Sequence, residues 1–184
     1  MKRVVVAALL LALPLLARAE RLRVDVLVFL NPPSAFERGT APRHPDDVRA
    51  LSLDDARGLA YQGIALLPES NTTLAAEWAT LKASKSYRPL LRMSWIQQSP
   101  SSDRGPALRV YQPGGDGVSG LGGWLRLHGG RSPALSADLE YVQANPGQPP
   151  TGQRLQERRV LGLETLHYLD SPRVGVLARV TVAR

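Results

Sequence analysis

Alternating apolar and polar residues recur along most of this chain, and a period of two is typical of β-strands. The clearest case runs from Leu22 to Leu30, where every second residue is apolar. Toward the end of this segment, Leu27 and Phe29 make the second face apolar as well. Such a strand is expected near the middle of a sheet, with a further element covering one end of it.

The same alternation continues through the second half of the chain. It predicts strands at 89–97, 107–112, 121–128, 135–141, 155–168 and 173–183. The pattern slips near Gly162, which predicts a bulge or a close backbone approach within that strand. The turn residues at 169–172 predict a reversal of the chain before the last strand.

One segment shows a strong helical period. Between Thr72 and Ser84, Leu74, Trp78 and Leu81 recur every three or four residues among alanines, and Asn71 is a candidate N-cap. Proline- and glycine-rich loops are expected at 31–68 and 145–152, with a candidate surface helix at 46–57. The sequence therefore predicts an α+β fold, a largely antiparallel sheet of about six strands with one main helix packed on a face.

The first nineteen residues have the form of an export signal. Lys2 and Arg3 precede an apolar run from 4 to 16, and Ala17-Arg18-Ala19 predicts cleavage before Glu20. The run is shorter than the ~20 residues that cross a bilayer, so an uncleaved anchor is the weaker alternative. We therefore expect a signal peptide at 1–19, a single domain at 20–184, a periplasmic location and no stable membrane insertion after cleavage.

Charge and cysteine content narrow the function further. The chain has a formal net charge of +7 and no cysteine, which excludes disulfides, thiolate metal sites and acylation of a cysteine at the cleavage site. Arginine supplies nearly all of the positive charge, and its planar guanidinium suits carboxylates and phosphates. In an exported protein this favours an anionic envelope partner rather than nucleic acid, although a merely solvated surface explains the charge equally well.

No motif with catalytic spacing is present, and no cofactor or metal is predicted. His167 and Asp170 form a weak metal pair at most, because an aspartate in a turn more commonly stabilises that turn. Glu77, on the predicted helix, is the one candidate for the acid of a wall hydrolase, and an exposed helical glutamate is the commoner explanation.

Aromatic and basic residues share a face of the strand at 121–128. Trp124, Arg126 and His128 are expected to project together. An indole can stack on a sugar ring while an arginine binds a carboxylate. The alternative is that a second layer of the structure buries Trp124.

Two longer stretches carry recognisable motifs. The first, 67–98, carries an L-P-x-S element, the helix, S-x-x-Y-R-P-L-L and W-x-Q; the second, 157–177, carries paired arginines, E-x-L-H-Y-x-D-x-P and G-V-L. Both stretches resemble the CsiV family of periplasmic peptidoglycan-binding proteins from Gram-negative bacteria. The chain departs from the family pattern at Arg92 and Ser171, where relatives usually have histidine, and at 131–134, where they have R-Y-L-H.

The resemblance implies a non-catalytic peptidoglycan-binding protein that supports cell-wall synthesis, with a peptidoglycan synthase or its activator as partner. Together with the residues above, it implies ligand binding by Arg88, Trp95, Trp124, Arg126, Arg158, Arg159, His167 and Tyr168. The motifs at 87–89 and 167–172 also have a folding explanation, since they begin a strand and form a turn. Two other functions stay open: a protein–protein adaptor whose 31–68 loop orders on a partner, and a hydrolase.

Overall fold

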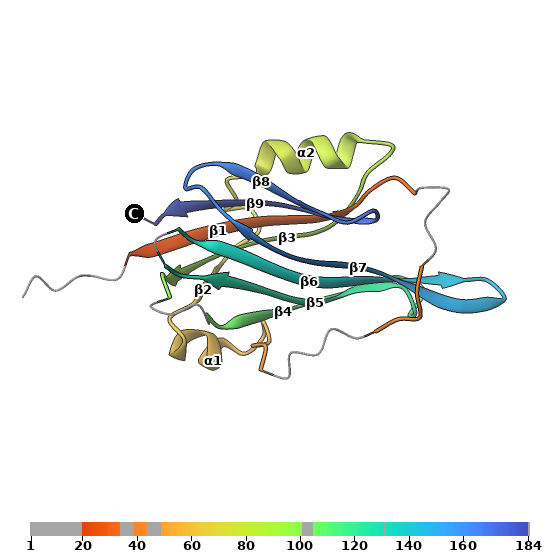
Figure 1. The fold of residues 1–184 in the computed structure, drawn as a ribbon, viewed down its shortest axis with the longest axis horizontal. Coiled ribbons are helices and arrows are strands. Elements are labelled where there is room, and N and C mark those ends of the chain that lie inside the picture. The colour runs from red at the N-terminus through yellow and green to blue at the C-terminus, as the bar shows by residue number, and fades with distance from the viewer. Residues whose placement is uncertain (1–19, 34–38, 44–48, 101–104, 131, 184) are drawn as a thin grey trace, which may run out of the picture.

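The computed structural model describes residues 20–33, 39–43, 49–100, 105–130 and 132–183, and within them it contains two antiparallel sheets (Figure 1). The first sheet has five strands in the order β2–β3–β1–β9–β8. Its strands are β1 (Arg21–Leu30), β2 (Ala65–Leu67), β3 (Arg88–Gln98), β8 (Leu166–Asp170) and β9 (Val174–Val182). The apolar strand at 22–30 is central in this sheet, between β3 and β9, as its pattern predicts.

The second sheet is a meander of four strands in sequence order. They are β4 (Ala107–Pro113), β5 (Gly120–His128), β6 (Ala134–Asn145) and β7 (Gln148–Val160). The fold is therefore mainly β. The predicted antiparallel strands are confirmed, but the prediction of one sheet of about six strands with a main helix on it is only partly right.

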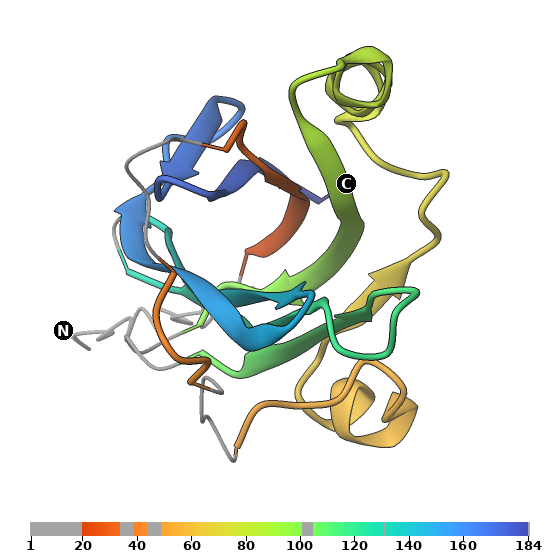
Figure 2. The ribbon, with the colours of Figure 1, turned by 90° about the vertical axis from the view of Figure 1, so that its right-hand side faces the viewer.

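The two sheets face each other and share one core (Figure 2). Val24, Val26 and Val28 of β1 point into it from one side, and Leu125 and Leu139 point into it from the other, all with no exposed surface. Burying a leucine or valine side chain contributes about 1.5–3 kcal/mol. A second sheet, rather than a helix, thus covers the inner face of the first.

Helix α2 (Ala75–Ala83) covers part of the outer face of the first sheet, where Leu27 and Phe29 lie (Figure 1). Leu74 and Leu81 complete this smaller core, as the helical spacing predicts. The predicted cap Asn71 is wrong. Leu74 occupies the N-cap position without a side-chain bond, and its N–H donates to the Thr72 hydroxyl instead (3.1 Å).

The 31–68 segment contains more regular structure than its prolines and charges suggest. Residues 46–48 of the helix predicted at 46–57 lie outside the described residues; in the described remainder, helix α1 (Ala56–Tyr61) begins only at Ala56, and β2 follows it. The Asp55 carboxylate caps α1 by accepting the Gly58 N–H (2.9 Å). Leu59 and Ile64 join the shared core, so this segment fills one side of the sandwich.

Two loop and strand assignments in the C-terminal half were wrong. The 145–152 loop is the tip of the β6–β7 hairpin, where Gly147 provides the positive φ of the turn (71°). The strand at 155–168 is two strands, β7 and β8, which belong to different sheets. The slip at Gly162 marks this crossover, and Leu163 then forms an isolated bridge to Val180.

The proposed signal peptide at 1–19 lies outside the described residues, so it remains a prediction. Among the residues that are described, no helix has the length and hydropathy needed to span a bilayer.

A buried carboxylate connects the first sheet to the start of α2. Asp25 has no exposed surface and accepts hydrogen bonds from Arg23 (2.9 Å), the Ser94 hydroxyl (2.6 Å) and both the N–H and hydroxyl of Thr73 (3.1 and 3.0 Å). Burial alone would raise the pKa of Asp25, but these bonds outweigh it and hold the pKa below its usual 3.8.

We predict that Asp25→Asn lowers the free energy of unfolding by about 3 kcal/mol, because Arg23 loses its buried partner. A carboxylate with a lowered pKa stabilises the fold above its unfolded pKa, and this contribution disappears as the pH falls below about 4. Urea unfolding at neutral and acid pH measures both effects. The exposed Asp54→Asn is the control, and equal losses in the two variants would contradict the prediction.

Candidate functional site

The outer face of the second sheet brings together several of the residues that the sequence predicted to bind a ligand. Because Leu125 and Leu127 of β5 point into the core, Trp124 and Arg126 point outward. Cross-strand register places Trp124 between Arg109 and Asp138. Arg126 lies in the next row, opposite Ser136, which in turn lies opposite Arg158 of β7.

We call this surface the arginine face. It comprises Arg109, Trp124, Arg126, His128, Ser136, Asp138, Glu140, Arg154, Gln156 and Arg158. Trp124 and Arg126 are partly exposed, and Arg158 is exposed. The described helices and the first sheet therefore do not bury these three residues completely, and Trp124 is not a core residue.

Trp124 and Arg126 are in direct contact. The guanidinium carbon lies 4.9 Å from the centroid of the indole, which is cation–π geometry. The two residues are separated by one position on the same strand, so β5 itself sets their relative position. An arginine stacked in this way loses less side-chain entropy when its N–H groups bind a ligand.

Of the two acids of the arginine face, Asp138 is paired through both oxygens and Glu140 is engaged through one oxygen only. Arg154 donates two hydrogen bonds to Asp138 (2.7 and 2.6 Å), which is a bidentate pair. Glu140 is 2% exposed, and its Oε1 accepts the N–H of Arg43 (2.9 Å). Among the described residues of this face, four arginines stand against two acids, so their summed charge is positive.

His128, the third member of the predicted group, is only 6% exposed. Its Nε2 lies 2.8 Å from the Ser136 hydroxyl. The imidazole therefore positions the serine between Arg126 and Arg158 and offers little surface to a ligand.

Three other predicted binding residues lie away from this face. Trp95 has no exposed surface, and its indole N–H donates to Gln97 (2.6 Å) inside the shared core. It is therefore a core residue, and its prediction as a ligand-binding residue is wrong. Arg88 is exposed and donates to the Tyr141 hydroxyl (3.2 Å). Arg159 points to the opposite side of β7 from Arg158 and donates to Glu157 (2.7 Å).

His167 and Tyr168 belong to the outer part of the first sheet. The Tyr168 ring stacks on Phe29 (6.0 Å between centroids), and its hydroxyl donates to Asp170 (2.6 Å). Asn31 also donates to Asp170 (2.8 Å), a contact across 139 residues that sequence patterns cannot reveal. His167 Nε2 accepts the Gly162 N–H (2.8 Å) and so fixes the crossover. These contacts support the folding explanation of the motif at 167–172.

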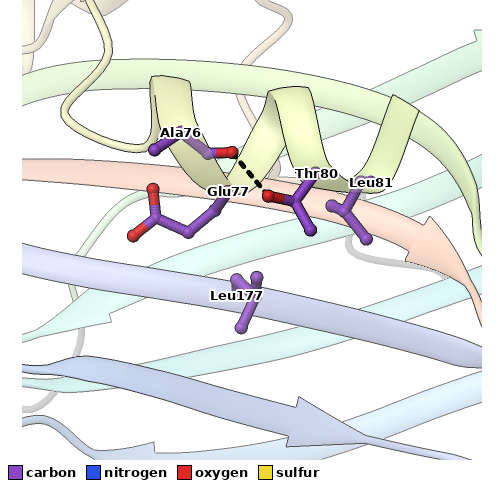
Figure 3. Close-up of a pocket in the computed structure, with 5 residues that line it drawn as sticks. All are labelled: Ala76, Glu77, Thr80, Leu81 and Leu177. Carbon is purple, nitrogen blue, oxygen red and sulfur yellow. Dashed lines mark hydrogen bonds between the residues drawn. The ribbon is translucent and has the colours of Figure 1, made fainter. Parts of the chain in front are cut away.

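A cavity of about 340 Å³ lies between α2 and β9 (Figure 3). It is lined by Ala76, Glu77, Thr80, Leu81 and Leu177. Glu77, the candidate acid of a hydrolase, accepts a hydrogen bond from Arg179 (3.1 Å). Glycoside hydrolysis normally uses two carboxyl groups, and Glu77 is the single acid in this lining. The cavity thus gives little support to a hydrolytic site.

Within the described part of the chain, no group of three or more residues has the composition of a metal site. His167 and Asp170 are each engaged in the contacts described above.

These features define a β-sandwich domain with a cationic, tryptophan-bearing sheet face. A family model described as CsiV, peptidoglycan-binding protein, matches residues 4–183, and the chain belongs to this family. No curated protein and no solved structure matches the chain. The family description indicates peptidoglycan binding and a location in the cell envelope.

The environment of Tyr168 has a measurable consequence. Burial and the bond to Asp170 raise the pKa of Tyr168 to about 12, because both disfavour the phenolate. We predict an absorbance change from tyrosine ionisation near pH 12, and we expect Tyr168→Phe to abolish it. The same substitution should lower the free energy of unfolding by about 1 kcal/mol. Tyr111→Phe, at an exposed tyrosine, is the matched control. Retention of the high-pH step in Tyr168→Phe would refute the assignment.

Proposed function

We propose that this chain is a non-catalytic periplasmic protein that binds peptidoglycan through the arginine face and supports cell-wall synthesis. The observation that carries the proposal is the contact between Trp124 and Arg126 on a partly exposed sheet face whose described arginines outnumber its described acids. Membership of a peptidoglycan-binding family supports peptidoglycan as the ligand, and the positive charge of the arginine face is complementary to the carboxylates of that polymer.

The physical basis of the proposed binding is the attraction between arginines and carboxylates, together with the repeated units of the polymer. Peptidoglycan consists of sugar strands with short peptides that carry carboxylates, and an arginine binds a carboxylate through two parallel hydrogen bonds. Each contact at an exposed surface is weak. A polymer that presents the same groups many times can still retain the protein, because rebinding to a neighbouring unit is effectively intramolecular.

The finer parts of the proposal rest on other observations. The periplasmic location is supported by the export pattern at 1–19 and by the family, and the partnership with a synthase or its activator is implied by the family resemblance alone. A non-catalytic role is supported by the ion pair that engages Glu77 with Arg179.

We predict that the mature protein sediments with purified sacculi at low salt. The double variant Arg126→Gln/Arg158→Gln should lose about tenfold in affinity, since two exposed ionic contacts of about 0.7 kcal/mol each are lost. Raising the salt concentration from about 0.05 M to about 0.5 M should also weaken binding of the wild-type protein to sacculi, because salt screens ionic contacts.

Lys85→Gln, which removes an exposed charge beyond the end of α2, is the matched control and should bind as the wild type does. Circular dichroism shows whether each variant is folded. Recovery of the wild type entirely in the supernatant at low salt would refute peptidoglycan binding by this surface. Crosslinking of that same protein to envelope proteins in cells would then favour the adaptor function.

A further inference from the structure

We infer that a sugar ring of the glycan strand stacks on Tyr111, with Gly122 as the open floor beside the ring and Arg109 as a hydrogen-bond donor. We call these three residues the tyrosine patch. This inference rests on the proposed function and names the part of the polymer that this end of the sheet contacts. It moves the aromatic platform expected at Trp124 to a neighbouring position on β4.

Trp124 itself is a poor platform for a sugar. Stacking of a sugar requires an open aromatic face, whereas the guanidinium carbon of Arg126 lies 4.9 Å from the centroid of the indole. Trp124 is also only partly exposed. The indole thus already has a partner on one face, and a more open ring on the same surface is the better platform.

Tyr111 provides such an open ring. Leu108 and Val110 of β4 point into the shared core, so Arg109 and Tyr111 point outward. Tyr111 is 72% exposed, and neither its ring nor its hydroxyl has a partner among the described side chains. A single exposed tyrosine is ordinary on a protein surface, and its neighbours decide what it can bind.

Gly122 leaves space beside the ring. It lies directly opposite Tyr111 in the register of β4 and β5, one strand spacing of about 5 Å away. No described atom lies within 4 Å of a Cβ built at this glycine, and its backbone does not adopt a positive φ. The absence of a side chain is therefore not required by the fold, and it lets a ligand approach the ring.

Arg109 supplies hydrogen-bond donors at one end of the ring. It lies two residues before Tyr111 on the same face, which corresponds to about 7 Å along the strand. Its side chain is exposed and forms no hydrogen bond or ion pair with the described residues. A guanidinium only donates hydrogen bonds, and the hydroxyl and acetamido oxygens of an amino sugar accept them. An aromatic ring with such a donor beside it suits a neutral N-acetylated sugar.

The tyrosine patch is also accessible from the side of the sheet. β4 is the edge strand of the second sheet (Figure 1), and among the described residues its outer edge pairs only at the bridge between Leu51 and Leu108. A polymer strand can therefore reach Tyr111 from beyond the edge as well as from above. Because Arg109 belongs to both surfaces, the patch continues the arginine face to the edge of the sheet.

Titration with a neutral oligosaccharide tests the inference. Tetra-N-acetylchitotetraose consists of β-linked N-acetylated sugar rings and carries no peptide and no charge. We expect it to bind the mature protein and to shift the backbone amide NMR signals of 109–112 and 121–124. Tyr111→Ala should weaken the affinity for this probe about fivefold to tenfold, because the ring is lost, whereas Tyr111→Phe should keep most of it. Arg109→Met, which keeps the aliphatic stem without the donors, should weaken it about threefold.

Filling the open space beside the ring is a second test. Gly122→Val adds a side chain where no described atom would clash, and β-branched residues favour strands, so this variant should be at least as stable as the wild type. It should still bind the oligosaccharide at least about fivefold more weakly, because the valine occupies the space beside Tyr111. The matched controls are Gly115→Ser, at another glycine with open space, and Tyr61→Ala, at a tyrosine that is 89% exposed on α1. Both controls should bind as the wild type does.

The outcomes separate this inference from the proposed function. Retention of the protein on sacculi without any binding of the oligosaccharide would overturn the sugar platform and leave peptidoglycan binding intact. Equal affinity of Tyr111→Ala and the wild type for the oligosaccharide, or an equal loss in Tyr61→Ala, would also overturn it. Absence of binding to sacculi would overturn the proposed function itself. Circular dichroism shows whether each variant is folded, and the exposed Tyr111→Ala decides the matter if Gly122→Val does not fold.

Discussion

The burial of one shared core between two sheets is the constraint on which the rest of the structure depends. Each strand gives one of its two faces to this core, so the identity of the inward residues decides which side chains reach the surface. Trp95 and Trp124 illustrate the consequence. Trp95 shares a face with Met93 and is sealed in the core, whereas Trp124 alternates with Leu125 and reaches the arginine face.

Close approach of the strands supports the site locally. Gly123 precedes Trp124 and has a φ of 137°, and a Cβ there would lie 2.1 Å from the carbonyl oxygen of Asp138. Only glycine allows β5 and β6 to approach so closely at this point. The backbone beside Trp124 is thus fixed by packing, which places the indole and its stacked arginine on a rigid element rather than on a loop.

The alternation of residues predicts the individual strands well, because it reflects directly which side of each strand is buried. It cannot assign strands to sheets, because an apolar residue does not reveal which layer covers it. Leu27 lies under α2 and Leu125 lies in the shared core, yet both are simply apolar in the sequence. The break between β7 and β8 was missed for this reason. The signal that excludes Trp95 from a binding site was present in the sequence, where Leu91, Met93 and Trp95 alternate with Arg92 and Ser94.

The contacts of Asp170 with Asn31 and of Asp25 with Thr73 join residues far apart in sequence, and a pattern of local spacing contains no information about them. The candidate site was therefore predictable where it follows one strand, as with Trp124 and Arg126. It was not predictable where it requires register, as with Arg158 across Ser136.

The paired arginines of the family signature show how one short motif can serve two purposes. Consecutive residues in a strand point to opposite faces, so Arg158 and Arg159 cannot act on one ligand together. Arg159 holds Glu157, whose second oxygen accepts the N–H of Asp170 (3.0 Å), and this chain of contacts joins β7 to β8 across the two sheets. Arg158 lies on the other side of β7, on the arginine face. A relative that retained only the second arginine would keep the junction of the sheets and lose one cation of the arginine face.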